Sequence, residues 1–239
     1  LDAGCGGGTK ANAYAQCKAK TVIGIDGSKL ALSAAEIVSE KFQNKNTIFR
    51  EGFLENLLDI LGKEDIDRVD HITCAQVIHH CEGWKDIIRQ FSDCLADGGI
   101  LEIIWVDPSL GISRRESGLL FLIKNKIAFH LGKTPKSRTE IGKKLFRRWD
   151  DKLRQRWNVE DDSFYADRYA AFYRVITLSS MLKELRDNNC RVVESYPAIS
   201  AKEFVRQASC DPKNRIKAFP MMRYLINHGL ILGAVATLL

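Results

Sequence analysis

Several features of secreted, membrane-spanning and zinc-binding proteins are missing from this sequence. No positively charged start leads into an apolar stretch, so no signal peptide is visible. The apolar run at residues 229–239 is too short for a membrane span, which needs about 20 residues. Its length is right for a final β-strand, paired with the strand that we predict over residues 191–196. The chain begins on its first motif, so we expect that most of the first strand and anything before it are missing.

The seven cysteines contain no C-x-x-C pair. Their odd number and scattered positions favour a reduced protein, and we expect a cytoplasmic location. Cys74 and Cys81 lie near His79 and His80, but without a partner pair this group does not favour zinc. We therefore expect no metal site.

A glycine loop opens the chain. Gly4, Gly6 and Gly8 form G-x-G-x-G, and glycines let the backbone turn sharply while a ligand lies on its N–H groups. A dinucleotide-binding loop would have its third glycine at the position of Thr9. Asp2 before the loop would repel phosphates and suit a cation. The pattern favours a positively charged, nucleoside-like ligand such as a sulfonium cofactor.

A second acidic residue follows at the distance typical of a ribose-binding carboxylate. Residues 21–26 are a short apolar run that ends in Asp26, about 20 residues after the loop. Ser28 is placed to cap a helix, in which an apolar stripe is expected. The stripe comprises Leu30, Leu32, Ala35, Ile37, Val38 and Phe42. The order strand, loop, helix, strand, helix indicates a doubly wound fold.

A third segment completes a resemblance. Residues 70–81 read D-H-I-T-C-A-Q-V-I-H-H-C, and a predicted helix over 84–95, the turn Asp97-Gly98-Gly99 and an apolar strand to Val106 follow. The three motifs, in this order, resemble the class I S-adenosylmethionine-dependent methyltransferases, in the small-molecule branch similar to methyltransferase types 11 and 12. Asp97 stands where that family usually has proline.

The resemblance implies one α/β domain over 1–239. Its sheet would be doubly wound, mostly parallel and seven-stranded, with helices on both faces and a helical cap inserted after strand five at 108–176. It implies S-adenosyl-L-methionine as cofactor and S-adenosyl-L-homocysteine as product. The implied cofactor-binding residues are Asp2, Gly4, Gly6, Gly8, Asp26, Gly27, Phe53, Leu54, Cys74, Ala75 and Gln76.

The sequence departs from the family near the expected adenine site. The usual acid should lie near Gly52 and Phe53, where the chain has none. We expect Phe53 to cover the adenine face while the backbone N–H of Leu54 reaches the ring.

The segment from Ser109 to Trp157 is far more basic than acidic, and the net charge of +6 is concentrated there. Apolar residues recur at helical spacing between the charges, which predicts two amphipathic helices. The bases are either a solvated helix face or a surface that attracts an anionic metabolite, a lipid head group or RNA.

An aromatic run at residues 163–174 precedes a helix marked by Thr177, Met181 and Leu182. By the resemblance, Tyr165, Arg168, Tyr169 and Tyr173 are candidate substrate contacts; the alternative is burial against the cap.

Methyl transfer from a sulfonium needs mainly alignment, because the leaving group is already activated. For a hydroxyl acceptor, His79 or His80 would be the base, unless one of them caps the next helix; a carboxylate acceptor needs no base. We expect methyl transfer to O, N or C of a small anionic or lipid-like metabolite. The alternatives are a tRNA methyltransferase of the wobble-uridine type and a non-catalytic partner subunit with the cofactor fold.

Overall fold

The computed structural model describes residues 1–17, 19–106, 118–157, 161–196 and 231–238. The chain divides into two compact units. The sheet unit consists of Leu1–Trp105, Thr177–Ser195 and Gly233–Leu239. The helical unit consists of Val106–Ile176 and Tyr196–Leu232. Predictions that fall on residues 107–117 and 197–230 lie outside the described residues, as does Cys210, one of the seven cysteines.

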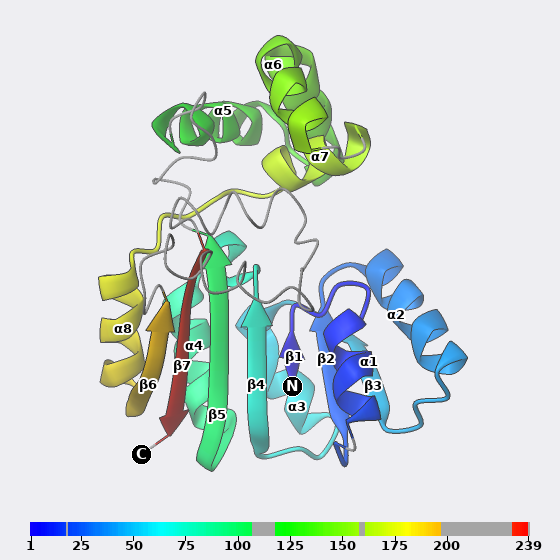
Figure 1. Ribbon diagram of the computed structural model, residues 1–239, viewed down its shortest axis with the longest axis vertical. Helices are drawn as coiled ribbons and strands as arrows, with labels where there is room; N and C mark the ends of the chain where they lie inside the picture. The colour runs from blue at the N-terminus through cyan, green and yellow to red at the C-terminus, as the bar shows by residue number, and fades with distance from the viewer. Residues whose placement is uncertain (18, 107–117, 158–160, 197–230, 239) are drawn as a thin grey trace, which may run out of the picture. The chain divides into compact units, whose positions relative to one another are not determined.

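The sheet has seven strands in the order β3-β2-β1-β4-β5-β7-β6. Every pairing from β3 across to β5 is parallel, and Figure 1 draws β7 in the opposite direction to its neighbours. The strands are β1 (Asp2–Ala3), β2 (Val22–Asp26), β3 (Thr47–Glu51), β4 (Val69–Ala75), β5 (Leu95–Val106), β6 (Cys190–Tyr196) and β7 (Ile231–Leu238). The predicted seven-stranded, mostly parallel sheet is confirmed, including the final strand beside β6.

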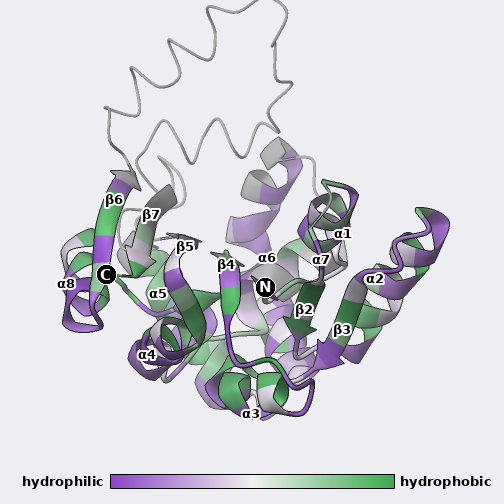
Figure 2. Ribbon diagram, turned by 90° about the horizontal axis from the view of Figure 1, so that it is seen from below, coloured by the Kyte–Doolittle hydropathy of each residue, from purple (hydrophilic) through white to green (hydrophobic). Residues whose placement is uncertain are grey.

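Helices cover both faces of this sheet. Figures 1 and 2 show α1 on one face and α3 and α4 on the other. The helices of the sheet unit are α1 (Thr9–Gln16), α2 (Lys29–Lys41), α3 (Leu57–Gly62), α4 (Trp84–Cys94) and α8 (Leu178–Asp187), with the short 3₁₀ helices η1 (Leu54–Asn56) and η2 (Ile78–His80). The central strands meet the helices with buried apolar residues such as Ile25, Ile72 and Ile103, as expected of a parallel sheet covered on both sides.

Side-chain caps explain where two helices begin. The Ser28 hydroxyl accepts a hydrogen bond from the Ala31 N–H at 3.3 Å, and the Thr177 hydroxyl accepts one from the Ser180 N–H at 3.2 Å. Each bond satisfies one of the N–H groups that the first turn leaves without an intrahelical partner. The predicted cap at Ser28 is confirmed.

The predicted apolar stripe of α2 is only half correct. Leu32 and Ala35 are buried, whereas Leu30, Ile37 and Phe42 are 84%, 66% and 53% exposed. α2 packs beside β3 at the edge of the sheet. A helix at the edge of a sheet is covered by the sheet along only one narrow face. The apolar residues of α2 outside that face therefore stay in contact with solvent.

The predicted turn before β5 also needs correction. Asp97, Gly98 and Gly99 lie within β5, which begins at Leu95. Val69 pairs with Leu95 and His71 pairs with Ile100, so β5 carries extra residues at this point and forms a bulge. Gly98 has φ +71°, a conformation that favours glycine.

The described part of the helical unit contains α5 (Gly118–Leu131), α6 (Pro135–Trp157) and α7 (Asp161–Tyr169). The first two are the predicted amphipathic helices, whereas α7 falls in the aromatic run, for which no helix was predicted. Their apolar core is Phe121, Ala128, Phe146, Phe164, Tyr165, Tyr169 and Tyr173. α6 meets α7 closely, because a Cβ on Gly142 would lie 2.3 Å from the Tyr169 ring.

A charged cluster lies inside this core. The Asp150 carboxylate pairs with Lys124 Nζ at 2.8 Å and with Arg168 Nη2 at 3.5 Å, and it accepts a hydrogen bond from the Tyr169 hydroxyl. All four residues are buried. Breaking a buried pair leaves an uncompensated charge, which costs about 3–5 kcal/mol. The cluster therefore joins α5, α6 and α7 in one specific arrangement.

Candidate functional site

The carboxyl ends of three central strands meet at one edge of the sheet. Ala3, the last residue of β1, is opposite Ile25 of β2 and Cys74 of β4. The glycine loop, Asp26 and Gln76 therefore leave the sheet side by side. The strand order reverses between β1 and β4, and open α/β sheets bind ligands in the crevice at such a reversal.

The three loop glycines have left-handed backbones, with φ +77° at Gly4, +50° at Gly6 and +72° at Gly8. Two of them are also required by packing. A Cβ on Gly4 would lie 2.2 Å from Val77 Cγ2, and one on Gly8 would lie 2.5 Å from the Cβ of Ala35. A Cβ on Gly6 would meet no atom within 4 Å. Gly6 therefore faces open space, as a glycine that leaves room for a ligand should.

Asp26 connects this loop to the end of β2. Its Oδ2 accepts a hydrogen bond from the Gly6 N–H and its Oδ1 accepts one from the Ser28 N–H, both at 2.8 Å. An ionised carboxylate has about four lone-pair positions. Two are used here, so the Asp26 carboxylate retains acceptor capacity for the hydroxyl groups of a ligand.

Asp2 has a structural role that the sequence pattern did not predict. It is buried, and its Oδ2 accepts a hydrogen bond from the Ala11 N–H at 3.1 Å. α1 has Gly8 at its N-cap, which has no side chain to satisfy that turn. Asp2, which belongs to β1, caps the helix instead. The sequence pattern that could have predicted this cap is an acidic residue before a loop whose last residue, at the N-cap, is glycine. Burial raises the pKa of Asp2, and the Ala11 hydrogen bond opposes part of that effect.

The electrostatic potential at the loop disfavours negative charge. The pKa of Cys5 is raised to about 12, first by burial and then by the nearby carboxylates of Asp2 and Asp26. Burial disfavours a charge of either sign, so only the smaller part of this shift, which comes from the two carboxylates, depends on the sign of a ligand's charge; that part disfavours a phosphate and favours a cation. This supports the distinction drawn from the sequence between a sulfonium-type and a dinucleotide-type ligand.

Phe53 lies beside Gly27, next to Asp26. Its ring is 67% exposed, and a Cβ on Gly27 would be 2.9 Å from Phe53 Cε1. The following residue, Leu54, is buried and begins η1, so its N–H belongs to a first turn without intrahelical partners. The structure thus places an exposed aromatic ring next to a backbone N–H that has no intrahelical partner.

The end of β4 contributes the remaining predicted residues of this edge. Cys74 is buried, which raises the pKa of its thiol, and Ala75 is half-buried. Gln76 is exposed with φ +62°, and its N–H donates to the Ile104 carbonyl at 2.6 Å. The residues implied as cofactor contacts on β1, β2 and β4 therefore lie at one edge of the sheet.

The two candidate bases differ in their surroundings. His79 and His80 belong to η2, with ring centroids 4.2 Å apart. His79 is buried, and burial followed by the neighbouring imidazole lowers its pKa well below its usual value. His80 is half-buried. A neutral, buried His79 is a weak base, so His80 is the better placed of the two.

The predicted substrate contacts belong to the helical unit. Tyr165, Arg168, Tyr169 and Tyr173 are all buried in its core. The Asn125 amide also fixes the backbone here, because it donates to the carbonyls of Arg168 and Ala171, both at 2.8 Å. Their side chains hold the helical unit together in this structure, and a substrate-binding role for them stays a prediction.

Solved structures of other proteins share this fold. An S-adenosylmethionine-dependent methyltransferase from Mesorhizobium loti aligns with 99% of this chain and 88% of its own, at TM-score 0.56 and 15% identity. PKMT2 from Rickettsia typhi, solved with S-adenosylhomocysteine, aligns with 100% of this chain and 48% of its own, at TM-score 0.59 and 15% identity. The [4+2]-cyclase SpnF aligns at TM-score 0.54 and 16% identity, over 100% of this chain and 73% of its own. These similarities establish the fold alone.

The sequence comparison identifies the family of the sheet unit's main segment. Residues 1–101 match the family model described as a methyltransferase domain. Together with the fold, this match supports a class I S-adenosylmethionine-dependent methyltransferase. The methyltransferase domain therefore includes the glycine loop, Asp26 and the end of β4.

Curated relatives match a similar part of the chain. A ubiquinone biosynthesis O-methyltransferase from Leptothrix cholodnii is 31% identical over 123 residues, 52% of this chain and 48% of the relative. A ubiquinone biosynthesis O-methyltransferase from Paracidovorax citrulli is 29% identical over 143 residues, 60% of this chain and 55% of the relative. The chain spans about half the length of the curated relatives it matches.

Proposed function

We propose that this protein binds S-adenosyl-L-methionine at the carboxyl edge of its sheet and transfers the methyl group to a small-molecule acceptor. The observation that carries the proposal is the contact between Asp26 and Gly6. It holds the acidic end of β2 against a glycine loop whose outer face is open. The ribose hydroxyls of the cofactor would bind Asp26, and the remainder of the cofactor would lie along the loop.

The charges at this edge support a sulfonium cofactor. Asp2 and Asp26 disfavour an anion at the loop, whereas S-adenosylmethionine carries a sulfonium and an ammonium group. The bound cofactor supplies an activated methyl group. What the protein must supply is alignment of the acceptor with that methyl group and exclusion of competing water.

We propose an oxygen atom as the acceptor, because both curated relatives are named O-methyltransferases. For a hydroxyl acceptor, His80 would remove the proton, since its half-buried ring lies just beyond the end of β4.

Exposed basic residues of α6, among them Lys144, Arg147 and Arg148, favour an anionic or lipid-like metabolite in the helical unit. No helix among the described residues is long and apolar enough to cross a membrane.

The direct test is transfer of label from methyl-labelled S-adenosylmethionine into small-molecule, lipid and RNA fractions of a cell extract. We expect label in the small-molecule or lipid fraction, and none with the variant Asp26→Ala. Binding of S-adenosylhomocysteine without transfer to any fraction would favour a non-catalytic subunit and overturn the enzymatic proposal.

RNA is the second candidate acceptor. Trp149 on α6 is 64% exposed beside Arg147 and Arg148. Exposed aromatics among basic side chains are used to stack and hold single-stranded RNA. Label in the RNA fraction, lost in Trp149→Ala, would replace the small-molecule proposal with this one.

A further inference from the structure

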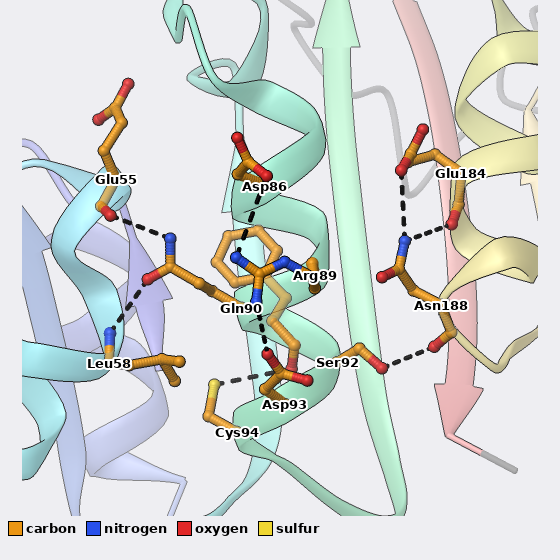
Figure 3. Close-up of polar contacts among 11 residues, drawn as sticks. Glu55, Leu58, Asp86, Arg89, Gln90, Ser92, Asp93, Cys94, Glu184 and Asn188 are labelled. Atoms are coloured by element: carbon orange, nitrogen blue, oxygen red, sulfur yellow. Dashed lines mark hydrogen bonds and ion pairs between the residues drawn. The ribbon is translucent and has the colours of Figure 1, made fainter.

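Gln90 of α4 is a buried polar side chain that binds the backbone of another element at two points. Glutamine is usually exposed, but this side chain is only 7% exposed. Its Nε2 donates to the Glu55 carbonyl at 3.0 Å, and its Oε1 accepts from the Leu58 N–H at 3.2 Å. Figure 3 shows the amide between these two backbone groups. Gln90 therefore joins α4 to the junction of η1 and α3.

The segment that Gln90 holds has little internal support. η1 has only three residues, and 3₁₀ helices of this length have poor hydrogen-bond geometry. Phe53, at its N-cap, makes no capping bond with its side chain. The position of this backbone therefore depends on contacts from outside the segment.

The beginning of the same segment is fixed to the end of β2, at the carboxyl edge of the sheet where the cofactor is proposed to bind. The Gly52 N–H donates to the carbonyl of Asp26 at 3.0 Å. Phe53 and Leu54 thus lie between two anchors, Asp26 before them and Gln90 after them.

We propose that Gln90 is a positioning residue for recognition of the adenine ring, an inference that rests on the proposed function. Gly52 and Phe53 lie where the resemblance implies an acid that meets the adenine, so the Leu54 N–H would be the donor to the ring. A backbone donor has no rotamers with which to adjust, so the backbone itself must be held in place. Gln90 holds this backbone in place, although it follows Leu58 by 32 residues and Glu55 by 35 residues in the sequence.

α4 also provides a matched control. Ser92 is about as buried as Gln90, and its hydroxyl donates to the Asn188 carbonyl at 2.6 Å. Figure 3 shows this bond on the side of α4 away from η1, toward the end of α8. Removing the Ser92 bond weakens the attachment of α4 without touching the predicted adenine site.

The experiment compares two ligands by calorimetry, S-adenosylhomocysteine and S-inosylhomocysteine. Ring nitrogen N1 accepts a hydrogen bond in adenine but carries a proton in hypoxanthine, so a donor at Leu54 favours the first ligand. We expect Gln90→Met, which keeps the length of the side chain, to lower that preference about tenfold. We expect Ser92→Ala to keep the wild-type preference, even where it lowers Tm as much as Gln90→Met does.

Each outcome separates this inference from the proposed function. If the wild-type protein binds neither ligand, the proposed function fails. If it prefers S-adenosylhomocysteine and Gln90→Met keeps that preference, only the role of Gln90 is overturned. Gln90→Glu gives a second variant, because it retains an acceptor for the Leu58 N–H but cannot donate to the Glu55 carbonyl when ionised.

Hydrogen exchange on the wild-type protein tests the same point without substitution. The Leu58 amide should exchange slowly in the free protein, and the Leu54 amide should slow only when S-adenosylhomocysteine binds. Fast exchange at Leu58 in the free protein would show that Gln90 does not hold this backbone, whether or not the variants fold.

Discussion

Gly6→Ala separates the ligand-binding role of the glycine loop from its structural role. The φ of +50° at Gly6 costs an alanine about 1–2 kcal/mol. No clash is added, because the new methyl group would meet no atom within 4 Å. For a chain of this length we expect a fall in Tm of roughly 4 °C. The methyl group would occupy the space proposed for the cofactor, so the affinity for S-adenosylhomocysteine should fall roughly 100-fold or more.

Thermal denaturation and calorimetry on the same samples measure both effects. Gly62→Ala is the control, since its Cβ would also meet no atom within 4 Å and it ends α3, outside the glycine loop. It should leave both Tm and affinity near their wild-type values. Unchanged affinity for S-adenosylhomocysteine in Gly6→Ala would refute the proposal that the cofactor lies along the glycine loop. A fall in Tm much larger than that expected above would show that the loop is packed rather than open at Gly6.

Three other substitutions test the packing and electrostatics. Gly4→Ala should lower the free energy of unfolding by more than about 3 kcal/mol in chemical denaturation, because its Cβ would overlap Val77 at a φ of +77°; a cost below about 1 kcal/mol would contradict this. Lys124→Met should cost about 3 kcal/mol by the same measurement, because it removes the closest cation from buried Asp150; no loss would show that the pair is not stabilising. The unfolding free energy should fall as pH drops from about 6.5 to 5, since His79 binds a proton more readily when unfolded. Denaturation at several pH values should show a shallower fall in His79→Gln, and an identical slope would refute this reasoning.

Local patterns predicted the parts of the fold that depend on local chemistry. The Ser28 cap, the strand ending at Asp26 and the two amphipathic helices follow from residue types at fixed spacing. The candidate cofactor edge was also predictable, because parallel strands bring their carboxyl ends together. Glycine spacing predicted a sharply turning loop, and all three glycines have left-handed φ, but the spacing did not reveal that only Gly6 of the three has open space beside it.

Features set by tertiary packing were not predictable in this way. The cap that Asp2 provides for α1 was not predicted, because only the fold brings β1 to the start of that helix; the role of Asp2 in cofactor binding stays a prediction. The outer stripe of α2 is exposed because the neighbouring strand is an edge. The contacts of Gln90 join residues more than 30 positions apart, and no spacing rule predicts them.

The buried tyrosines of the helical unit illustrate a further limit. An aromatic run fits a substrate site and a core equally well by composition. In the structure Tyr165 and Tyr169 lie in the core, and the Tyr169 hydroxyl donates to buried Asp150. That carboxylate comes from another helix, so the sequence around the tyrosines does not reveal it.

Calorimetric titration of S-adenosylhomocysteine into the wild-type protein and Asp26→Ala tests the central claim most directly. We predict one binding site in the wild-type protein and affinity reduced at least about 100-fold in Asp26→Ala, because the carboxylate that would bind the ribose hydroxyls is lost. Thermal denaturation should show that the variant is still folded. Absence of binding to the wild-type protein, or equal binding to folded Asp26→Ala, would contradict the account.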